Sequence, residues 1–235
     1  MITFIAHRGN DSKTWIENSI QGLTHAIEKD YIDGIELDVR MTKDKKIVVI
    51  HGITISDSVN ETKFISTSTL EQLKKYDLDP SKNSLEISTL DEVLSKINSD
   101  NNKKILIDIK EESIYYKTIV YQVHKILKRY HQLNFYICSF NYPLLKYWKQ
   151  KYPKDKVGII IGLLVNTDKF NTELDFISVN KHHLKKCNFR KETFLWTVNN
   201  EKELLDVMNN TRNVGIITDR SKILSKALKR NINYG

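Results

Sequence analysis

The sequence has few cysteines and no long apolar run. Its two cysteines, Cys138 and Cys187, form no CxxC or Cys/His pattern, which excludes a disulfide scaffold and a structural zinc site. The longest apolar run, residues 157–165, is much shorter than the ~20 residues that a membrane-spanning helix needs. No basic segment followed by an apolar one precedes the first predicted strand. We therefore expect a soluble cytoplasmic protein with no membrane span and with two buried or incidental thiols.

The charge is strongly positive but is not gathered in one place. The net charge is +8, and the lysines are scattered through segments such as 98–104, 127–132 and 149–156. A nucleic-acid interface would need a basic stripe with interleaved aromatic side chains. The pattern favours a solvated surface and no nucleic-acid partner, and the excess charge remains compatible with attraction of small anions.

Short apolar segments alternate with segments of helical period along the whole chain. With 40% hydrophobic residues, 235 residues suffice for one domain with a large core, so we predict a single domain over 1–235. The alternation predicts a parallel sheet covered by helices, and eight strands are the number that closes a TIM-like (β/α)8 barrel. An open doubly wound sheet is the alternative, but no GxGxxG follows the first strand. The predicted strands are 2–7, 34–39, 104–110, 134–140, 156–162, 174–180, 193–199 and 214–219.

One apolar segment, KIVVIH, does not belong to this alternation. The polar stretch TKDKK before it is too short for a crossover helix, so residues 35–52 are predicted to form a β-hairpin after the second strand. Pairing outward from the turn places Asp38 opposite or nearly opposite His51. The period of two places Glu36 on the same face as Asp38.

Two carboxylates on the inner face of a barrel strand repel each other unless a cation lies between them. A third acid, Asp108, shares a face with Lys110 at the end of another predicted strand. Oxygen ligands without cysteine favour one Mg²⁺ or Ca²⁺ ion, and Mn²⁺ is also compatible. The alternative is that these acids form plain ion pairs, Glu36 with Arg8 or Arg40 and Asp108 with Lys110.

The first predicted strand ends in AHRGN, which places His7 and Arg8 at the edge of the barrel where active sites lie. An arginine suits the bidentate grasp of a phosphate. Two histidines, His7 and His51, on either side of a phosphodiester can act as general base and general acid, while a metal and Arg8 neutralise developing charge. The group of residues points to phosphodiester hydrolysis.

The order of these motifs resembles the glycerophosphodiester phosphodiesterase family. The matching stretches are HRG, ENS, IELDVRMTKD, VVIHG, STLDEVL, IDIK, SF at 139–140, WTVN at 196–199 and GIITD ending at Asp219. The resemblance implies a TIM-like barrel and metal-dependent hydrolysis of glycerophosphodiesters to glycerol phosphate and an alcohol. It also implies a small insertion, here roughly residues 52–85.

The resemblance also assigns roles to individual residues. The catalytic histidines would be His7 and His51, and we assign His51 as the general acid. Trp196 would line the substrate pocket, its alternative role being ordinary barrel core. The remaining implied roles are phosphate or substrate binding by Arg8, Lys110 and Glu17, and metal binding by Glu36, Asp38 and Asp108.

Three residues depart from the family pattern. Gly52 replaces an aspartate that usually follows the second histidine, so we expect His51 to be held less firmly. Asp108 is one methylene shorter than the usual glutamate, which weakens it as a metal ligand. Lys45 occupies a turn position that usually has glycine, so we expect an unusual turn or a strained φ.

Two other functions remain open alternatives. The substitutions at Gly52 and Asp108 would suit a degenerate barrel that binds phosphate without catalysis. A related barrel enzyme that cleaves lysophospholipids by phospholipase D chemistry would need an apolar mouth, but the predicted insertion is largely polar. A small, water-soluble glycerophosphodiester is therefore the expected partner.

Overall fold

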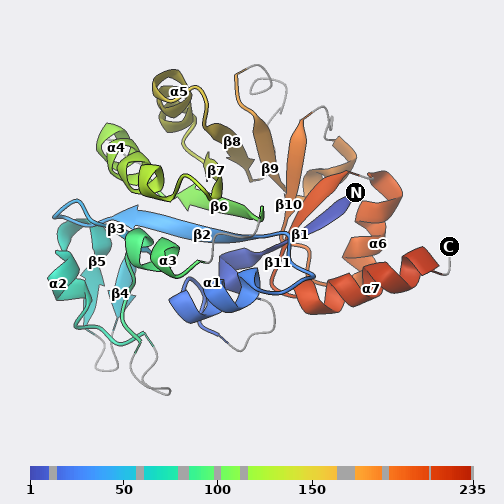
Figure 1. The fold of residues 1–235 in the computed structure, drawn as a ribbon, viewed down its shortest axis with the longest axis horizontal. Coiled ribbons are helices and arrows are strands. Elements are labelled where there is room, and N and C mark those ends of the chain that lie inside the picture. The colour runs from blue at the N-terminus through green and yellow to red at the C-terminus, as the bar shows by residue number, and fades with distance from the viewer. Residues whose placement is uncertain are drawn as a thin grey trace.

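Eight parallel strands close into a barrel in the computed structural model of the chain (Figure 1), as the sequence predicts. Strand β1 pairs with both β2 and β11, which completes the ring. The barrel strands, in order around the ring, are β1 (Ile2–Ala6), β2 (Gly34–Met41), β6 (Lys104–Ile109), β7 (Asn134–Ser139), β8 (Lys156–Ile161), β9 (Phe176–Asn180), β10 (Glu192–Trp196) and β11 (Val214–Thr218). The structure describes residues 1–10, 15–56, 61–78, 85–97, 102–111, 116–162, 173–186, 191–211 and 213–233.

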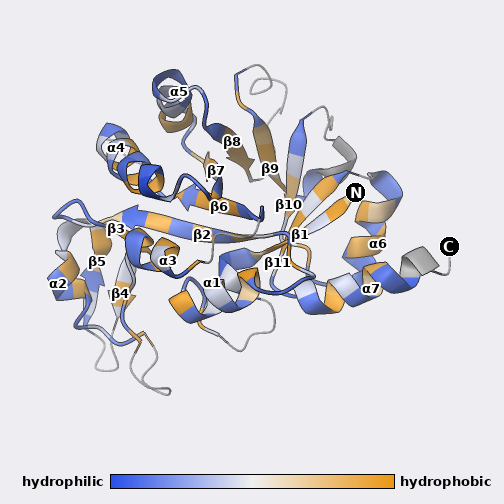
Figure 2. Ribbon diagram, in the orientation of Figure 1, coloured by the Kyte–Doolittle hydropathy of each residue, from blue (hydrophilic) through white to orange (hydrophobic). Residues whose placement is uncertain are grey.

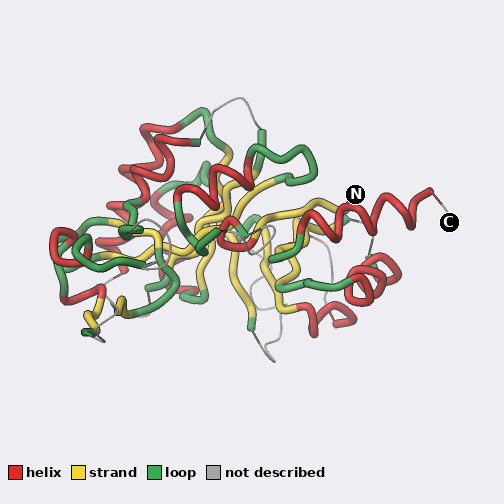
Figure 3. The backbone as a smooth tube through the Cα atoms, turned by 90° about the horizontal axis from the view of Figure 1, so that it is seen from below, coloured by secondary structure: helices red, strands yellow, loops and turns green. Residues whose placement is uncertain are grey.

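Helices surround the strands, as the view from below makes plain (Figure 3). Several begin with a side-chain cap, and Thr89 and Glu92 form a reciprocal capping box at the start of α3. Within the described parts of the chain, no helix has the length and apolarity that would let it cross a membrane. The helices are α1 (Ile20–Ile27), α3 (Leu90–Lys96), α4 (Tyr116–Leu127), α5 (Tyr142–Lys151), α6 (Glu201–Asn210) and α7 (Ser221–Asn233), with the 3₁₀ segments η1 (His7–Gly9), η3 (Lys128–Tyr130) and η5 (Lys181–Lys186).

The alternation within β2 decides which side chains enter the barrel. Ile35, Leu37 and Val39 belong to the large cluster that packs the strands against the helices, and all three are fully buried. Because successive strand residues point to opposite faces, the residues between them, Glu36 and Asp38, point into the barrel. Figure 2 shows both hydrophobic and hydrophilic residues along β2, and its two acids line a cavity at one end of the barrel.

Three aromatic rings fill the barrel interior below that end. Tyr136, Phe176 and Phe194 meet edge to face, with centroid separations of 5.3 to 5.7 Å. Two glycines make room for them: a Cβ at Gly158 would lie 2.3 Å from the Phe176 ring, and one at Gly215 would lie 2.3 Å from the Phe194 ring. The barrel interior is therefore a packed core below the polar end of the barrel.

The predicted hairpin is present. Strand β3 (Ile47–Val49) pairs antiparallel with β2, with Val39 opposite Val49. This register continues to Ile50, whose N–H donates to the Asp38 carbonyl at 3.0 Å, so His51 is one position past the residue opposite Asp38. The expected unusual turn is confirmed, because Lys45 has φ +60°.

The residues after the hairpin form a small unit beside the barrel, at the left of Figure 1. It contains β4 (Thr54–Ser56), β5 (Thr62–Phe64), η2 (Ile65–Thr67) and α2 (Leu70–Leu73). The unit has its own apolar cluster with the back of β3, made by Val48, Ile55, Ile65, Leu73, Tyr76 and Ile87. These elements fall in the predicted insertion, of which 57–60 and 79–84 lie outside the described residues.

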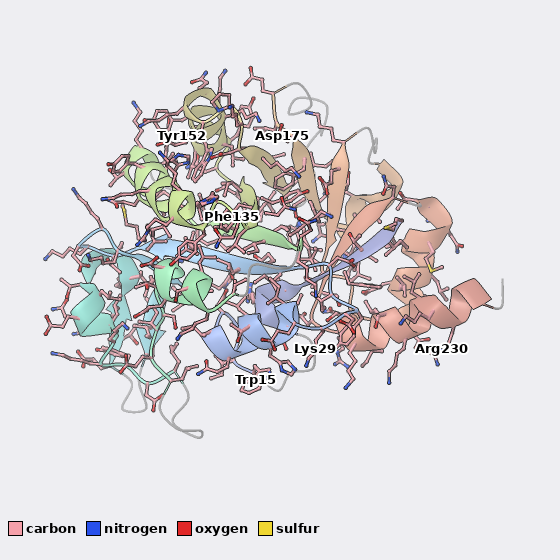
Figure 4. All side chains as sticks on the ribbon, viewed as in Figure 1. Trp15, Lys29, Phe135, Tyr152, Asp175 and Arg230 are labelled. Carbon is pink, nitrogen blue, oxygen red and sulfur yellow. The ribbon has the colours of Figure 1, made fainter. Side chains whose placement is uncertain are left out.

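Asp175, labelled in Figure 4, joins the barrel to helix α5 on the outside of the molecule. Its carboxylate accepts hydrogen bonds from Lys149 Nζ at 2.7 Å and from the backbone N–H of Val157 at 2.8 Å. The hydrogen-bond partners of Asp175 therefore lie away from the polar end of the barrel.

The close contact between Gly158 and the Phe176 ring predicts that a side chain at position 158 destabilises the protein. Gly158→Ala should lower the free energy of unfolding by about 1–3 kcal/mol, because Phe176 is fully buried and its ring has to shift. Gly162→Ala is the matched control just after the same strand, since among the described residues its Cβ would meet only Phe140, at 3.8 Å. Urea denaturation of both variants measures the difference, and equal stabilities would contradict the packing described.

Candidate active site

A cavity of about 150 Å³ opens at the carboxyl ends of the barrel strands. It contains eight of the nine predicted site residues, and the ninth, Glu17, reaches it only through Arg8. The residues that line it are His7, Arg8, Glu36, Asp38, His51, Asp108, Lys110, Cys138, Phe140, Ile160, Ser178, Trp196 and Ile217.

Three acids meet in this cavity because of strand register. Asp38 and Asp108 are direct partners in the parallel pairing of β2 with β6, and Glu36 is one inward position earlier on β2. All three are buried, and one carboxylate oxygen of each lies within 4.8 Å of the others. Burial and the charge of Asp38 raise the pKa of Glu36 to about 8, and burial raises the pKa of Asp108 to about 6. The raised pKa values mean that burial disfavours three simultaneous negative charges in this cluster.

Two cationic side chains neutralise part of this charge. Lys110 Nζ lies 3.0 Å from Asp38 Oδ1 and 2.5 Å from Asp108 Oδ2, and Arg8 Nε lies 3.0 Å from Asp38 Oδ2. Burial alone would raise the pKa of Asp38, but Lys110 and Arg8 outweigh burial and hold it below its usual value. The ion pair of Asp108 with Lys110, which the sequence offered as an alternative to a metal site, is therefore present.

The cationic contacts do not satisfy the whole cluster. The second oxygen of Asp108, Oδ1, is buried without a hydrogen-bond partner. Among the described residues, Glu36 accepts one hydrogen bond, from the backbone N–H of Arg8 at 3.0 Å, and no ion pair joins it to the side chain of Arg8 or Arg40. Three converging carboxylates, one of which has a buried oxygen without a partner, fit an oxygen-preferring divalent ion such as Mg²⁺ or Ca²⁺.

The HRG sequence forms a tight turn that aims its side chains at these acids. Arg8 and Gly9 both have positive φ, +53° and +72°. A Cβ at Gly9 would lie 2.7 Å from the backbone nitrogen of Leu23, so only glycine lets the turn rest against helix α1. The turn brings the Arg8 N–H to Glu36, while Glu17 accepts a 2.7 Å hydrogen bond from Arg8 Nη1.

Asn18 is a site residue that the sequence reasoning missed. Its side chain donates from Nδ2 to Asp38 Oδ2 at 2.9 Å and accepts from the Asp38 backbone N–H at 3.0 Å. It also has φ +61°, a conformation that asparagine tolerates better than most residues. Asn18 is the second residue of the ENS motif, but the sequence analysis assigned a role only to the first, Glu17.

The two histidines are held in different ways. His7 Nδ1 lies 2.7 Å from Asp219 Oδ1, and His7 Nε2 lies 4.0 Å from Glu36 Oε2. Burial lowers the pKa of His7, but the hydrogen bond to Asp219 and the charge of Glu36 outweigh burial and raise it. The partner, Asp219, ends the GIITD segment and was given no role from the sequence.

His51 follows two residues after β3. Its ring makes no hydrogen bond within the described residues, and burial lowers its pKa. Its backbone carbonyl accepts a 2.9 Å hydrogen bond from Arg40 Nε, and Arg40 Nη1 donates to the Lys110 carbonyl at 3.0 Å. Arg40 thus ties the hairpin end to β6, while the ring remains unanchored, as the glycine at position 52 led us to expect.

The opposite wall of the cavity is mostly apolar. Phe140 and Trp196 meet edge to face with centroids 6.1 Å apart, and the Phe140 ring also lies 5.5 Å from Lys110 Nζ. The indole N–H of Trp196 is buried without a hydrogen-bond partner. Cys138 lies below the acids, where burial raises the pKa of its thiol far above the usual value. Cys187 lies outside the described residues.

Comparison with known proteins matches this chain to one family over nearly its whole length. A family model described as the glycerophosphoryl diester phosphodiesterase family matches residues 7–223. A glycerophosphodiester phosphodiesterase of Caldanaerobacter subterraneus subsp. tengcongensis is 32% identical over 96% of this chain and 97% of its own length. Another, from Bacillus altitudinis, is 26% identical over 93% of this chain and 95% of its own length.

Solved structures share the fold. A phosphodiesterase of Oleispira antarctica, in complex with the product sn-glycerol-3-phosphate, superposes with a TM-score of 0.85 at 20% identity and covers 97% of this chain and 96% of its own. A glycerophosphodiester phosphodiesterase of Thermotoga maritima gives a TM-score of 0.74 at 25% identity, covering 96% and 98% of the two chains.

The hydrogen bond from the Asn18 amide to Asp38 predicts that a negative charge at position 18 destabilises the protein. Asn18→Asp should lower the free energy of unfolding by about 1–3 kcal/mol in the presence of EDTA, because a carboxylate replaces the amide that donates to buried Asp38. Asn200→Asp is the matched control: Asn200 caps helix α6, where aspartate serves equally well. Denaturation of both variants in urea checks this, and an unchanged stability for Asn18→Asp would contradict the assigned bond.

Proposed function

Because the chain belongs to the glycerophosphoryl diester phosphodiesterase family, we propose that it hydrolyses glycerophosphodiesters to glycerol phosphate and an alcohol with one divalent metal ion. The observation that carries the proposal is the shared cavity: three buried carboxylates within 4.8 Å of one another lie beside two histidines and an arginine. A non-catalytic barrel would have no need to keep both histidines at this edge.

Glu36, Asp38 and Asp108 would hold the metal ion. When bound, a divalent ion acts as a Lewis acid that withdraws charge from the phosphoryl oxygens. The oxygen ligand set favours Mg²⁺ or Ca²⁺, with Mn²⁺ also compatible. Asp108 would be the weakest of the three as a ligand, because it is one methylene shorter than the glutamate that the family pattern has at this position.

Arg8 and Lys110 would hold the phosphodiester. Arg8 lines the cavity with its Nε 3.0 Å from Asp38 Oδ2, and its guanidinium would supply positive charge and N–H donors to a phosphoryl oxygen. Lys110 lies between the acids and the Phe140 ring, which keeps its ammonium at the cavity wall. Burial lowers the pKa of Lys110, but Asp108 and Asp38 outweigh burial, so the side chain is a permanent cation in the site.

The two histidines would divide the proton transfers. His7 is suited to the role of base, because the carboxylate of Asp219 stabilises the imidazolium that forms when His7 accepts a proton. His51, on the insertion side of the cavity, would protonate the leaving alkoxide.

Trp196 would bind the organic part of the substrate. Its unpartnered N–H is a hydrogen-bond donor in an otherwise apolar wall, and a hydroxyl or phosphoryl oxygen of the substrate would satisfy it. Its position in the cavity wall supports the role that the family pattern implies for Trp196, as a residue that lines the substrate pocket.

One observation favours lysophospholipids as a second substrate class. Ile53 and Phe64 are more than half exposed although the insertion is mainly polar. Both line a second cavity that includes Lys110 and so adjoins the site.

The rate of hydrolysis of each of four substrates separates the two classes. The substrates are glycerophosphocholine, glycerophosphoethanolamine, glycerophosphoinositol and a lysophospholipid, each measured with EDTA, Mg²⁺, Ca²⁺ or Mn²⁺.

Chelation should abolish turnover, and one divalent ion per chain should restore it, since the acid cluster lacks enough positive charge without it. Glu36→Gln or Asp38→Asn should reduce metal affinity more than Asp108→Asn. Calorimetric titration of EDTA-treated protein with Mn²⁺ measures this, and the activity panel measures the consequence. Full activity in excess EDTA, or equal affinity losses, would overturn the ligand assignment.

Alanine at either histidine should lower kcat by about 10²–10⁴-fold, the usual contribution of positioned proton transfer, with the fold and metal content intact. A p-nitrophenyl diester has a leaving group that needs little protonation. His51→Ala should therefore regain most of its activity on that ester, whereas His7→Ala should stay impaired. Rescue of neither variant, or of His7→Ala alone, would contradict the assigned roles.

A further inference from the structure

Asp219 lies just past β11 and holds His7 across the seam where β1 meets β11. One oxygen, Oδ1, lies 2.7 Å from His7 Nδ1, and the other, Oδ2, accepts a 2.7 Å hydrogen bond from Asn199 Nδ2. The Asp219 backbone N–H donates back to Asn199 Oδ1 at 2.9 Å. Asn199 therefore grips both the backbone and the carboxylate of Asp219.

The orientation of the Asn199 amide follows from its other contacts. Its Oδ1 accepts hydrogen bonds from two donors, the Thr218 hydroxyl at 3.0 Å and the Asp219 N–H. A flipped amide would set its NH₂ group against the Asp219 N–H, which can only donate, and its oxygen against the Asp219 carboxylate, which can only accept, so the NH₂ group has to face the carboxylate.

Asn199 is itself held by helix α6. The Asn199 backbone N–H donates to Glu203 Oε2 at 2.8 Å, and Glu203 Oε1 accepts a 2.6 Å hydrogen bond from Lys181 Nζ. The chain of contacts runs from the helices outside the barrel to a histidine in the cavity.

This arrangement sets the tautomer of His7. Burial raises the pKa of Asp219, but the hydrogen bonds from His7 and Asn199 outweigh burial and lower it, so Asp219 is a carboxylate that can only accept. Neutral His7 must then carry its proton on Nδ1, which leaves the lone pair of Nε2 facing the acids. The ring of His51 has no such partner.

We propose that Asp219, clamped by Asn199, is a positioning residue that keeps His7 in the Nδ1–H tautomer with Nε2 ready to accept a proton from the attacking nucleophile. The inference rests on the proposed function of this site and assigns a role to Asn199 of the WTVN segment and Asp219 of the GIITD segment, two residues that the sequence left without one. Neither residue is required to touch the substrate.

Asp219→Asn tests the proposal, because the amide keeps the shape of the side chain but can donate to Nδ1 and favour the wrong tautomer. The variant should lose about 10²–10⁴-fold in kcat, with KM and Mn²⁺ affinity within about twofold of the starting protein. The loss should be the same on a p-nitrophenyl diester. Asp175→Asn is the matched control, since Asp175 has buried partners of its own outside the site, and it should keep full kcat.

The double variant separates positioning from mere stability. In a His7→Ala background, Asp219→Asn should cost nothing further, because it acts only through His7. Additive losses would show a structural role and overturn the proposal.

A spectroscopic measurement does not depend on turnover. In EDTA-treated protein at a pH where His7 is neutral, ¹⁵N chemical shifts should report Nδ1–H for His7, and Asp219→Asn should move them toward the other tautomer. An Nε2–H tautomer in the starting protein would overturn the proposal. If no diester is hydrolysed but the tautomer responds as described, the proposed function fails while the positioning of His7 stands.

Discussion

The mutual repulsion of three buried carboxylates is the constraint on which the polar end of the barrel depends. Glu36, Asp38 and Asp108 enter the barrel because β2 and β6 alternate and pair in register. Every other polar contact near them supplies a positive charge or a hydrogen-bond donor: Arg8, Lys110, the Asn18 amide and the N–H of the tight HRG turn. Even so, burial keeps the pKa values of Glu36 and Asp108 raised, and the three acids lie close enough together to hold a metal ion.

Most of the fold was accessible from the sequence because it rests on local periodicity. Eight apolar strands between amphipathic helices, and a turn too short for a crossover, are patterns within a few residues of each other. The acids were accessible for the same reason, since Glu36 and Asp38 share a face of one strand. Family resemblance then assembled distant motifs such as HRG and IDIK into one site.

The residues that were missed act over distances that periodicity does not report. Asp219 and His7 are separated by 212 positions, and their contact exists only because β11 pairs with β1. Asn18 was hidden by its neighbour Glu17, whose charge seemed the stronger signal, although the amide contacts Asp38 directly. The contrast between an anchored His7 and an unanchored His51 likewise depends on which side chains surround each ring, and no spacing rule supplies that.

The pairing of β1 with β11 has a consequence for how the protein comes into being. During synthesis the ribosome releases His7 early, but the strand that carries its partner emerges last, with only α7 after it along the described chain. A nascent chain that has already built the acids on β2 and β6 still has an open barrel and a histidine without its carboxylate. The contact between His7 and Asp219 therefore forms only when the ring closes, so a truncated product that lacks β11 would hold the acids with a His7 that lacks its carboxylate partner.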